Sequence, residues 1–273
     1  MQVIRTTLLG FIGVVAVSLA ACGGTGITPG QTAPSTPNPN ATGTAVVRFI
    51  AGAPDYASFD VKLDGVLLIS TLPYSAITPY YLVSGGVTHT IEFDATGTTN
   101  PIVPAITTPV LSGVNKTVSF VLAGSQSKNN VQMQAFAEPT YTNTTLQGVV
   151  NFHNSAPTLA SSLDWGTFTP GATDYTVSQT VKYTASATPV PQPTPSLVPA
   201  PAATGKGIGF YIVPTGQTAS ATIAPAFTIL PSAIDTANAH NYFPYATGGD
   251  YHLSIFVIDT AKTPFVQLVA RFD

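Results

Sequence analysis

Cys22 is the residue whose type and position most directly suggest covalent chemistry. It is the only cysteine in a chain of 273 residues, and it follows Leu19-Ala20-Ala21 at the end of an apolar N-terminal run. A thiolate is a strong nucleophile, and small residues before it would fit the cleft of a peptidase. A single cysteine also excludes an intrachain disulfide and a site built from several thiolates. Covalent modification of this thiol is therefore the first chemistry to consider.

The stretch from Leu19 to Cys22 resembles the lipobox of bacterial lipoproteins. In that motif the cysteine receives a diacylglyceryl group as a thioether, and the precursor is cut just before it. The resemblance implies lipidation of Cys22 and a signal peptide over residues 1–21. Arg5 precedes an apolar run of about a dozen residues, which is shorter than the roughly 20 needed to span a bilayer. An uncleaved transmembrane anchor is the less favoured alternative.

The residue after the cysteine bears on the destination of the anchored protein. Gly23 stands where an aspartate is the usual signal for retention in the inner membrane. The resemblance therefore implies attachment to the outer membrane through the lipid on Cys22, at the periplasmic face or the cell surface. Residues 22–43 are rich in Gly, Thr, Pro and Asn and carry no charge, so we expect a disordered tether with a reach of about 25 Å.

Composition narrows the classes of fold and partner. Charged residues make up only 8% of the chain, beside 24 Pro and 23 Gly, which is typical of a strand-rich and turn-rich extracytoplasmic protein. The net charge is −3, and the sequence has no basic patch. A nucleic-acid partner is therefore disfavoured.

An internal repeat with an offset of about 103 residues organises the rest of the chain. Val46-Val47-Arg48-Phe49 opens the first copy, and Val149-Val150-Asn151-Phe152 opens the second. Further matches follow in the same order: Phe59-Asp60-Val61 with Leu163-Asp164-Trp165, Tyr74 with Tyr183, Leu82-Val83 with Leu197-Val198, Thr96-Gly97 with Thr215-Gly216, Ile106 with Phe227, and Val131-Gln132-Met133 with Val266-Gln267-Leu268. We therefore predict two modules, at residues 44–140 and 147–273.

Within each module the hydrophobic period is two. Phe59, Val61 and Leu63 alternate with polar residues, and the same pattern recurs at 87–94, 118–122 and 251–257. Asp64-Gly65 has the composition of a tight hairpin turn. Short alternating strands between turns indicate an all-β fold made of two tandem antiparallel β-sandwiches, each with about seven or eight strands.

The first module resembles the bacterial family named domain of unknown function 4397. The segments that carry the resemblance are Val47-Arg48-Phe49, Ala53-Pro54-Asp55, Phe59 to Gly65, Tyr74, Tyr81 to Gly85 and His89-Thr90-Ile91. The second module departs from the pattern, although it keeps Phe152 to Pro157. The resemblance implies secreted or surface-anchored modules with an immunoglobulin-like or transthyretin-like sandwich. It implies no activity.

The histidines give no strong metal motif. His89 lies in phase with Ile91 and Phe93, which favours a structural histidine over a ligand. His153 follows an apolar strand, where capping a turn is the favoured interpretation. A metal site in the C-terminal part would require the side chains of His240, Asp250 and His252 to converge. We predict no metal site and no cofactor.

Motifs for catalysis are also missing. A pair of catalytic carboxylates could be formed by Asp60 with Asp55 or by Asp60 with Asp64. Asp60 and Asp64, however, share the polar face of one strand, and exposure of that face to solvent is the favoured interpretation. The sequence has no Gly-x-Ser-x-Gly elbow. Gly205-Lys206-Gly207-Ile208-Gly209 lacks the spacing of a phosphate-binding loop. We predict no catalytic residues.

A Pro-rich insert at residues 188–201 interrupts the second module. Its alternate prolines favour an extended conformation and cannot pair within a central strand. A surface-loop expansion is the favoured interpretation, and a protruding contact element is the alternative.

Together these features lead us to expect a non-catalytic binding or structural module on the cell envelope, with an envelope protein or glycan as its partner. The alternative is a hydrolase that acts on cell-envelope or carbohydrate material. A metal-binding module is a third possibility.

Overall fold

A computed structural model describes residues 31–32, 39–138, 147–157, 162–168, 176–183, 185–191, 196–199, 208–216, 227–229, 251–259 and 266–272. The regular secondary structure of these residues is almost entirely β-strand, which confirms the all-β fold class. The strands are β1 (Gln31–Thr32), β2 (Thr44–Gly52), β3 (Ser58–Leu63), β4 (Val66–Pro73), β5 (Tyr81–Ser84), β6 (Thr90–Ala95), β7 (Ile106–Thr107), β8 (Thr117–Ala123), β9 (Gln132–Ala137), β10 (Gln147–Asn154), β11 (Leu163–Phe168), β12 (Thr176–Val181), β13 (Val190–Pro191), β14 (Ser196–Pro199), β15 (Ile208–Pro214), β16 (Phe227–Ile229), β17 (Tyr251–Asp259) and β18 (Val266–Phe272). Two short 3-10 helices, η1 (Gly113–Asn115) and η2 (Gln126–Lys128), interrupt them.

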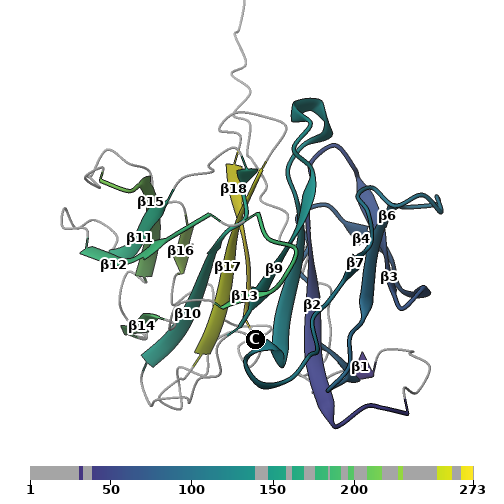
Figure 1. Ribbon diagram of the computed structural model, residues 1–273. Coiled ribbons are helices and arrows are strands. Elements are labelled where there is room, and N and C mark those ends of the chain that lie inside the picture. The colour runs from purple at the N-terminus through teal and green to yellow at the C-terminus, as the bar shows by residue number, and fades with distance from the viewer. Residues whose placement is uncertain are drawn as a thin grey trace, which may run out of the picture.

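The strands form four sheets (Figure 1). Sheet A has the order β1-β5-β2-β8-β9-β13, and sheet B has the order β4-β3-β6-β7. Sheet C has the order β14-β10-β17-β18, and sheet D has the order β12-β11-β15-β16. Most neighbouring strands are antiparallel, as expected, but the central pairs β2–β8 and β10–β17 are parallel. Each of these central pairs joins strands that are distant in the sequence.

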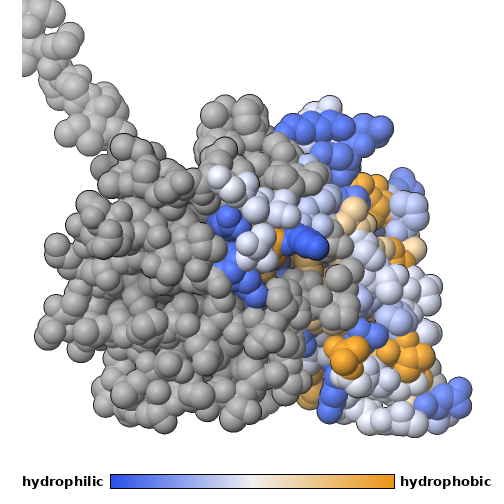
Figure 2. Space-filling model, turned by 60° about the vertical axis from the view of Figure 1, so that its left-hand side comes forward, coloured by the Kyte–Doolittle hydropathy of each residue, from blue (hydrophilic) through white to orange (hydrophobic). Residues whose placement is uncertain are grey.

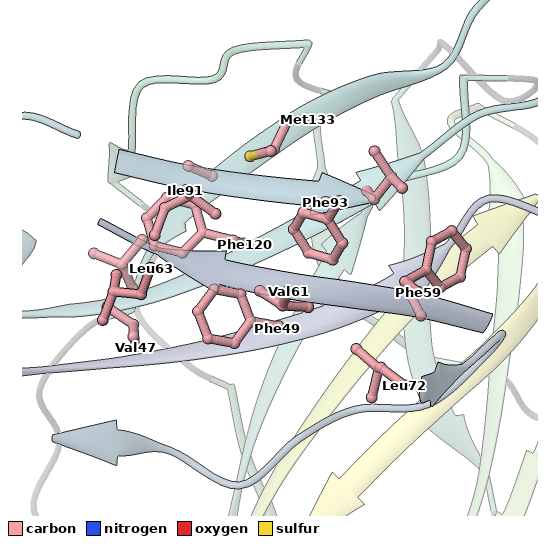
Figure 3. Packing of buried hydrophobic residues seen from close by; sticks show 14 of the residues in the cluster. Val47, Phe49, Phe59, Val61, Leu63, Leu72, Ile91, Phe93, Phe120 and Met133 are labelled. Atoms are coloured by element: carbon pink, nitrogen blue, oxygen red, sulfur yellow. The ribbon is translucent and has the colours of Figure 1, made fainter. Parts of the chain in front are cut away.

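Sheets A and B enclose one hydrophobic core, which Figure 3 shows from close by. Phe49 of sheet A lies at its centre, 6.0 Å from the ring of Phe93 in sheet B and 6.1 Å from that of Phe120. Strand β3 buries every second residue because only one of its faces meets the core. Strand β8 instead buries both faces over most of its length, so sheet A must be covered on its second side as well.

The predicted hairpin turn joins β3 to β4. Asp64 has a φ of 51° and Gly65 a φ of 76°, so both residues adopt the left-handed conformation that a tight two-residue hairpin requires. The Asp64 carboxylate accepts a hydrogen bond from the backbone N–H of Thr90 at 2.8 Å, which fixes the turn against β6. The turn prediction is confirmed.

Strand register reproduces the internal repeat residue by residue. Val46 pairs with Leu82 on one side and Thr117 on the other, and Val149 pairs in the same way with Leu197 and His252. We call β2–β9 the first repeat and β10–β18 the second repeat. Residues in equivalent register include Arg48 and Asn151, Ile50 and His153, Phe59 and Leu163, Leu72 and Val181, Ala95 and Pro214, Ile106 and Phe227, Ser119 and Ser254, Val121 and Phe256, and Met133 and Leu268. The boundaries at 44–140 and 147–273 stay predictions.

The second face of sheet A packs against sheet C. A separate apolar cluster joins Ile50, Val121 and Phe136 of sheet A to Phe256 and Ile258 of sheet C. The backbone of Gly52 allows the close approach, because a Cβ atom at that position would lie 3.0 Å from the Cγ2 atom of Ile258 and 2.9 Å from the Leu122 carbonyl oxygen. Equivalent faces of the two repeats therefore form one interface.

Two segments predicted to be irregular contain paired residues. Val190 and Pro191 of the Pro-rich insert form β13 at the edge of sheet A, and residues 196–199 form β14 at the edge of sheet C. Edge positions suit proline because its missing N–H can face away from the sheet. In the range predicted as a tether, residues 31–32 pair with β5, and the N–H of Thr42 donates to the Gly85 carbonyl at 2.9 Å. Cys22 and the signal peptide lie outside the described residues.

Candidate functional site

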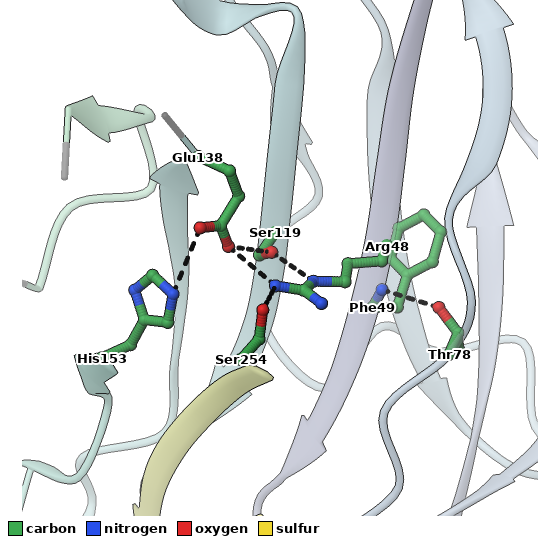
Figure 4. A network of polar contacts seen from close by, with 7 residues as sticks. All are labelled: Arg48, Phe49, Thr78, Ser119, Glu138, His153 and Ser254. Atoms are coloured by element: carbon green, nitrogen blue, oxygen red, sulfur yellow. Dashed lines mark hydrogen bonds and ion pairs between the residues drawn. The ribbon is translucent and has the colours of Figure 1, made fainter. Parts of the chain in front are cut away.

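A charged cluster lies between sheets A and C, next to the apolar cluster of their interface. Its members are Arg48 on β2, Ser119 on β8, Glu138 directly after β9, His153 on β10 and Ser254 on β17. All five residues are buried, and Arg48, Ser119, His153 and Ser254 have no exposed surface. Figure 4 shows these side chains converging from both repeats.

The Arg48 guanidinium connects the two sheets. Its Nε donates to Ser119 Oγ at 2.6 Å, and its Nη2 donates to Glu138 Oε1 at 3.0 Å. The same Nη2 also donates to Ser254 Oγ of the second repeat at 2.7 Å. The guanidinium carbon lies 4.5 Å from the ring centre of Tyr80 and 5.3 Å from that of Phe256. Arg48 therefore exchanges its hydration for hydrogen bonds and aromatic faces.

Glu138 is the counter-charge of the cluster. Its Oε1 accepts from Ser119 Oγ at 2.5 Å as well as from Arg48, and its Oε2 lies 3.3 Å from His153 Nε2. Burial alone would raise the pKa of this carboxyl group. The charges of His153 and Arg48, with the hydrogen bond from Ser119, overcome that effect and lower the pKa to about 2. Glu138 is therefore ionised at neutral pH.

The geometry of the cluster is unlike that of a nucleophilic triad. In a triad the histidine accepts the proton of the serine, and the carboxylate orients the histidine from its other side. Here Ser119 donates to Glu138, and Arg48 donates to Ser119. The imidazole of His153 is stacked on the ring of Phe256, with 4.4 Å between ring centres. With no exposed surface at Ser119 or His153, this arrangement suits the joining of two sheets and not the attack on a substrate.

The interpretation of His153 as the cap of a turn was wrong. His153 lies within β10, pairs with Phe256 of β17 in register, and places its Nε2 3.3 Å from Glu138 Oε2 across the interface. His89, by contrast, is the structural histidine that its phase predicted. Its Nδ1 lies 2.7 Å from the Asp64 carboxylate and its Nε2 lies 2.8 Å from the Ser84 carbonyl oxygen.

The three aspartates considered for carboxylate chemistry each bind a different part of the chain. Asp55 accepts from the N–H of Gln126 at 2.5 Å, and Asp64 binds His89 and Thr90 as described. Asp60 accepts from the N–H groups of Thr71 at 2.8 Å and Gly97 at 3.2 Å. The hydrogen bond from Thr71 is the main reason that the pKa of Asp60 is lowered. These carboxylates fix loops and do not converge on one point.

The second repeat uses its equivalent aspartate in the same way. Asp164 accepts from the Thr180 hydroxyl at 2.6 Å, the Thr215 hydroxyl at 3.1 Å and the Gly216 N–H at 3.3 Å. The hydrogen bond from Thr180 is the main cause of its lowered pKa. In both repeats one aspartate therefore holds the turn formed by a Thr-Gly pair.

The candidate metal ligands of the C-terminal part are not tested by the structure. His240 and Asp250 lie outside the described residues, and His252 is described only as a backbone position in β17. Among the residues that are described, no group of three or more His, Cys, Asp or Glu side chains could hold a metal ion. Within the same ranges, no helix is long and apolar enough to cross a bilayer.

Sequence reasoning missed the Arg48–Glu138 pair because 90 residues separate the two side chains. One signal was present: Arg48 stands inside the run Val46-Val47-Arg48-Phe49-Ile50, where a charge on a strand buried on both faces requires a partner. The position of that partner depends on the register of β9 against β8, which the run itself does not specify.

Comparison with known proteins identifies part of the chain. No curated protein matches the sequence. The family model of a domain of unknown function, DUF4397, matches residues 45–166. The matched range includes Arg48, Ser119, Glu138 and His153 of the charged cluster and extends past the predicted end of the first module at residue 140. The chain therefore contains a DUF4397-like domain.

Proposed function

We propose that this protein is a non-catalytic binding or structural module of the cell envelope, anchored to the outer membrane by a lipid on Cys22. The observation that carries the non-catalytic part is the use of its reactive side chains. Arg48, Glu138 and His153 hold two sheets together, while Asp60 and Asp164 hold loops. A buried side chain that already serves an internal contact is not available for a substrate.

The anchor rests on the sequence around the cysteine. Leu19-Ala20-Ala21-Cys22 closes an apolar run of about a dozen residues, as a lipoprotein precursor requires. One acyl chain alone gives only marginal membrane binding, so the three chains of a mature lipoprotein terminus would hold the module permanently. The exposed surface of the sandwich would then meet an envelope protein or a glycan.

Metabolic labelling with a fatty acid tests the anchor. The wild-type chain should incorporate label and lose residues 1–21, whereas Cys22→Ser should do neither. Label on the Cys22→Ser chain would overturn the proposal. Separation of the membranes, followed by protease treatment of intact cells, then tests the outer-membrane location and the exposed face.

A further inference from the structure

Large apolar side chains are exposed at one end of the first repeat. Among the residues that the structure describes, the large hydrophobic side chains classed as exposed are Val66 (39%), Leu67 (50%), Val110 (47%) and Val114 (73%). Single exposed apolar residues are ordinary on a protein surface. Their location at a common end is not, and we call these four residues the apolar rim.

Strand pairing places the apolar rim at the end where β2 begins. Ser84 pairs with Thr44 at the start of β2, and the Lys116 carbonyl accepts from the N–H of Val46, so η1 with Val114 lies at this end. The chain around Val110 reaches the same end, since the N–H of Gly86 donates to the Leu111 carbonyl at 3.0 Å.

The β3–β4 hairpin brings the other two members of the rim to this end. His89 contacts both the Asp64 carboxylate of the hairpin turn and the Ser84 carbonyl. Val66 and Leu67 directly follow that turn. All four rim residues therefore surround the same end of the sandwich.

The opposite end of the first repeat is hydrophilic. Its exposed loops are Thr96–Asn100, between β6 and β7, and Gln126–Asn129, which contains η2. The loop with η2 projects at the top of Figure 1, and the top of the described surface is strongly hydrophilic in Figure 2. The end with the apolar rim therefore exposes large apolar side chains, whereas the opposite end exposes hydrophilic loops suited to water.

The proposed anchor can reach the apolar rim. Gln31 is the ninth residue after Cys22, and nine residues span at most about 30 Å. Gln31 pairs with Tyr81 in β5. Tyr81 is three residues before Ser84, which lies at the end of the sandwich that carries the apolar rim. Lys116, also exposed at this end, adds a positive charge that complements the phosphates of anionic lipids.

We propose that the apolar rim faces the lipid bilayer, with Val66, Leu67, Val110 and Val114 in the interfacial layer and Lys116 among the head groups. This inference rests on the proposed lipid anchor at Cys22. Anchoring confines the module to a thin layer over the membrane, where even small apolar side chains gain by leaving water. The rim then orients the sandwich, and the hydrophilic end points away from the membrane.

A depth measurement tests the orientation. The full lipidated chain carries Val114→Cys, or Thr99→Cys at the hydrophilic end as the matched control, and the new thiol is labelled with an environment-sensitive dye. Each protein is reconstituted in phosphatidylethanolamine and phosphatidylglycerol vesicles with a nitroxide quencher near the top of the acyl chains. Quenching at position 114 should be several-fold stronger than at position 99. Replacing Val66, Leu67 and Val110 by Ser should reduce the quenching at 114 and leave that at 99 unchanged.

The failures of the two proposals are distinguishable. A chain that neither incorporates a fatty acid nor floats with the vesicles overturns the proposed function. A chain that floats but shows equal quenching at both positions overturns the inference about the rim alone. A dye response at position 114 that depends on protein concentration and not on the quencher lipid assigns the rim to a second copy of the chain, and also overturns the inference.

Discussion

The two repeats are most alike where each folds on itself and least alike where they face each other. Asp60 and Asp164 occupy equivalent positions and both accept a hydrogen bond from the glycine of a Thr-Gly turn. At the interface between sheets A and C, Arg48 is equivalent to Asn151, and Ile50 is equivalent to His153. The contact between the aspartate and the turn glycine occurs in both repeats, whereas the residues at the interface differ between the repeats.

This difference follows from electrostatics. Two identical faces with an arginine at this position would bring two buried cations together, at a large cost in free energy. One repeat instead supplies Arg48 and Glu138, and the other supplies His153 and Ser254. Ser119 and Ser254 are equivalent in register, and both hydroxyls accept a hydrogen bond from Arg48. A serine can therefore serve at this position in both repeats. Complementary charge therefore requires the repeats to diverge at the interface.

The largest effect is expected from breaking the interface pair. Arg48→Met leaves the Glu138 carboxylate buried without its cation, and we expect the free energy of unfolding to fall by about 3–5 kcal/mol. Denaturant unfolding measures this loss. Lys116→Met removes an exposed cation and is the control, with a change of less than about 0.5 kcal/mol. Equal losses in the two variants would contradict a structural role for the cluster.

The same cluster predicts a dependence of stability on acid. The pKa of Glu138 is about 2 in the folded chain and 4.5 as its ordinary value. The unfolded chain therefore binds more protons in this range, and the contribution of Glu138 is present above pH 4.5 and lost as the pH falls towards 2. The loss amounts to at most about 3 kcal/mol. Unfolding curves of the wild type and Glu138→Gln should differ in slope between pH 5 and 2, and parallel curves would refute this assignment.

Substitution of the equivalent aspartates, Asp60 and Asp164, should destabilise the protein less than loss of Arg48 and by a similar amount in each repeat. Asp60→Ala and Asp164→Ala each remove hydrogen bonds that a turn donates to a charged acceptor, which should cost roughly 1–2 kcal/mol of unfolding free energy. The two losses should agree within about 0.5 kcal/mol. A large difference between them would show that the repeats do not use this residue in the same way.

The glycines of the same turns sharpen the comparison further. Gly97 has a φ of 80° and Gly216 a φ of 85°, and a Cβ atom at either position would meet no atom within 4 Å. Alanine at either position should therefore cost about 1 kcal/mol through backbone conformation alone. Thermal unfolding of Gly97→Ala and Gly216→Ala, compared at one pH, measures both. A neutral substitution in one repeat would mean that its turn differs.

The smallest effect is expected from shortening the Pro-rich insert. Replacing residues 188–195 by a few Gly and Ser residues removes β13, which is a two-residue edge strand, but keeps the hydrogen bond from the Ala135 N–H to the Ser186 carbonyl. The change in unfolding free energy should stay below about 1 kcal/mol. Loss of cooperative unfolding would show that β13 is essential to sheet A.

Much of the fold could be predicted from local pattern. The alternation of Phe59, Val61 and Leu63 correctly predicted a strand with one buried face, because β3 has solvent on its other side. The Asp64-Gly65 turn followed from the conformations that these residues tolerate. The internal matches, such as Met133 with Leu268, agree with strand register because equivalent strands occupy equivalent places in sheets A and C.

The candidate site could not be predicted in the same way. Alternation disappears on β8, where both faces are buried, so the sequence does not distinguish the face towards the core from the face towards sheet C. Ser254 and Arg48 meet only after β17 has paired with β10 and the two sheets have packed, 206 residues apart in the chain. The cluster is thus a product of tertiary packing, and only the isolated charge of Arg48 indicated it in advance.

The central position of β2 has a mechanical consequence for an anchored protein. β2 is bonded to β5 on one side and to β8 on the other, and it is the first long strand of the described chain. A pull along this strand loads both ladders at once in shear, because the hydrogen bonds lie across the direction of force. Separation then requires many bonds to break together, which gives a slow forced-unfolding rate. β2 is thus held in a geometry that would resist tension transmitted from the proposed anchor.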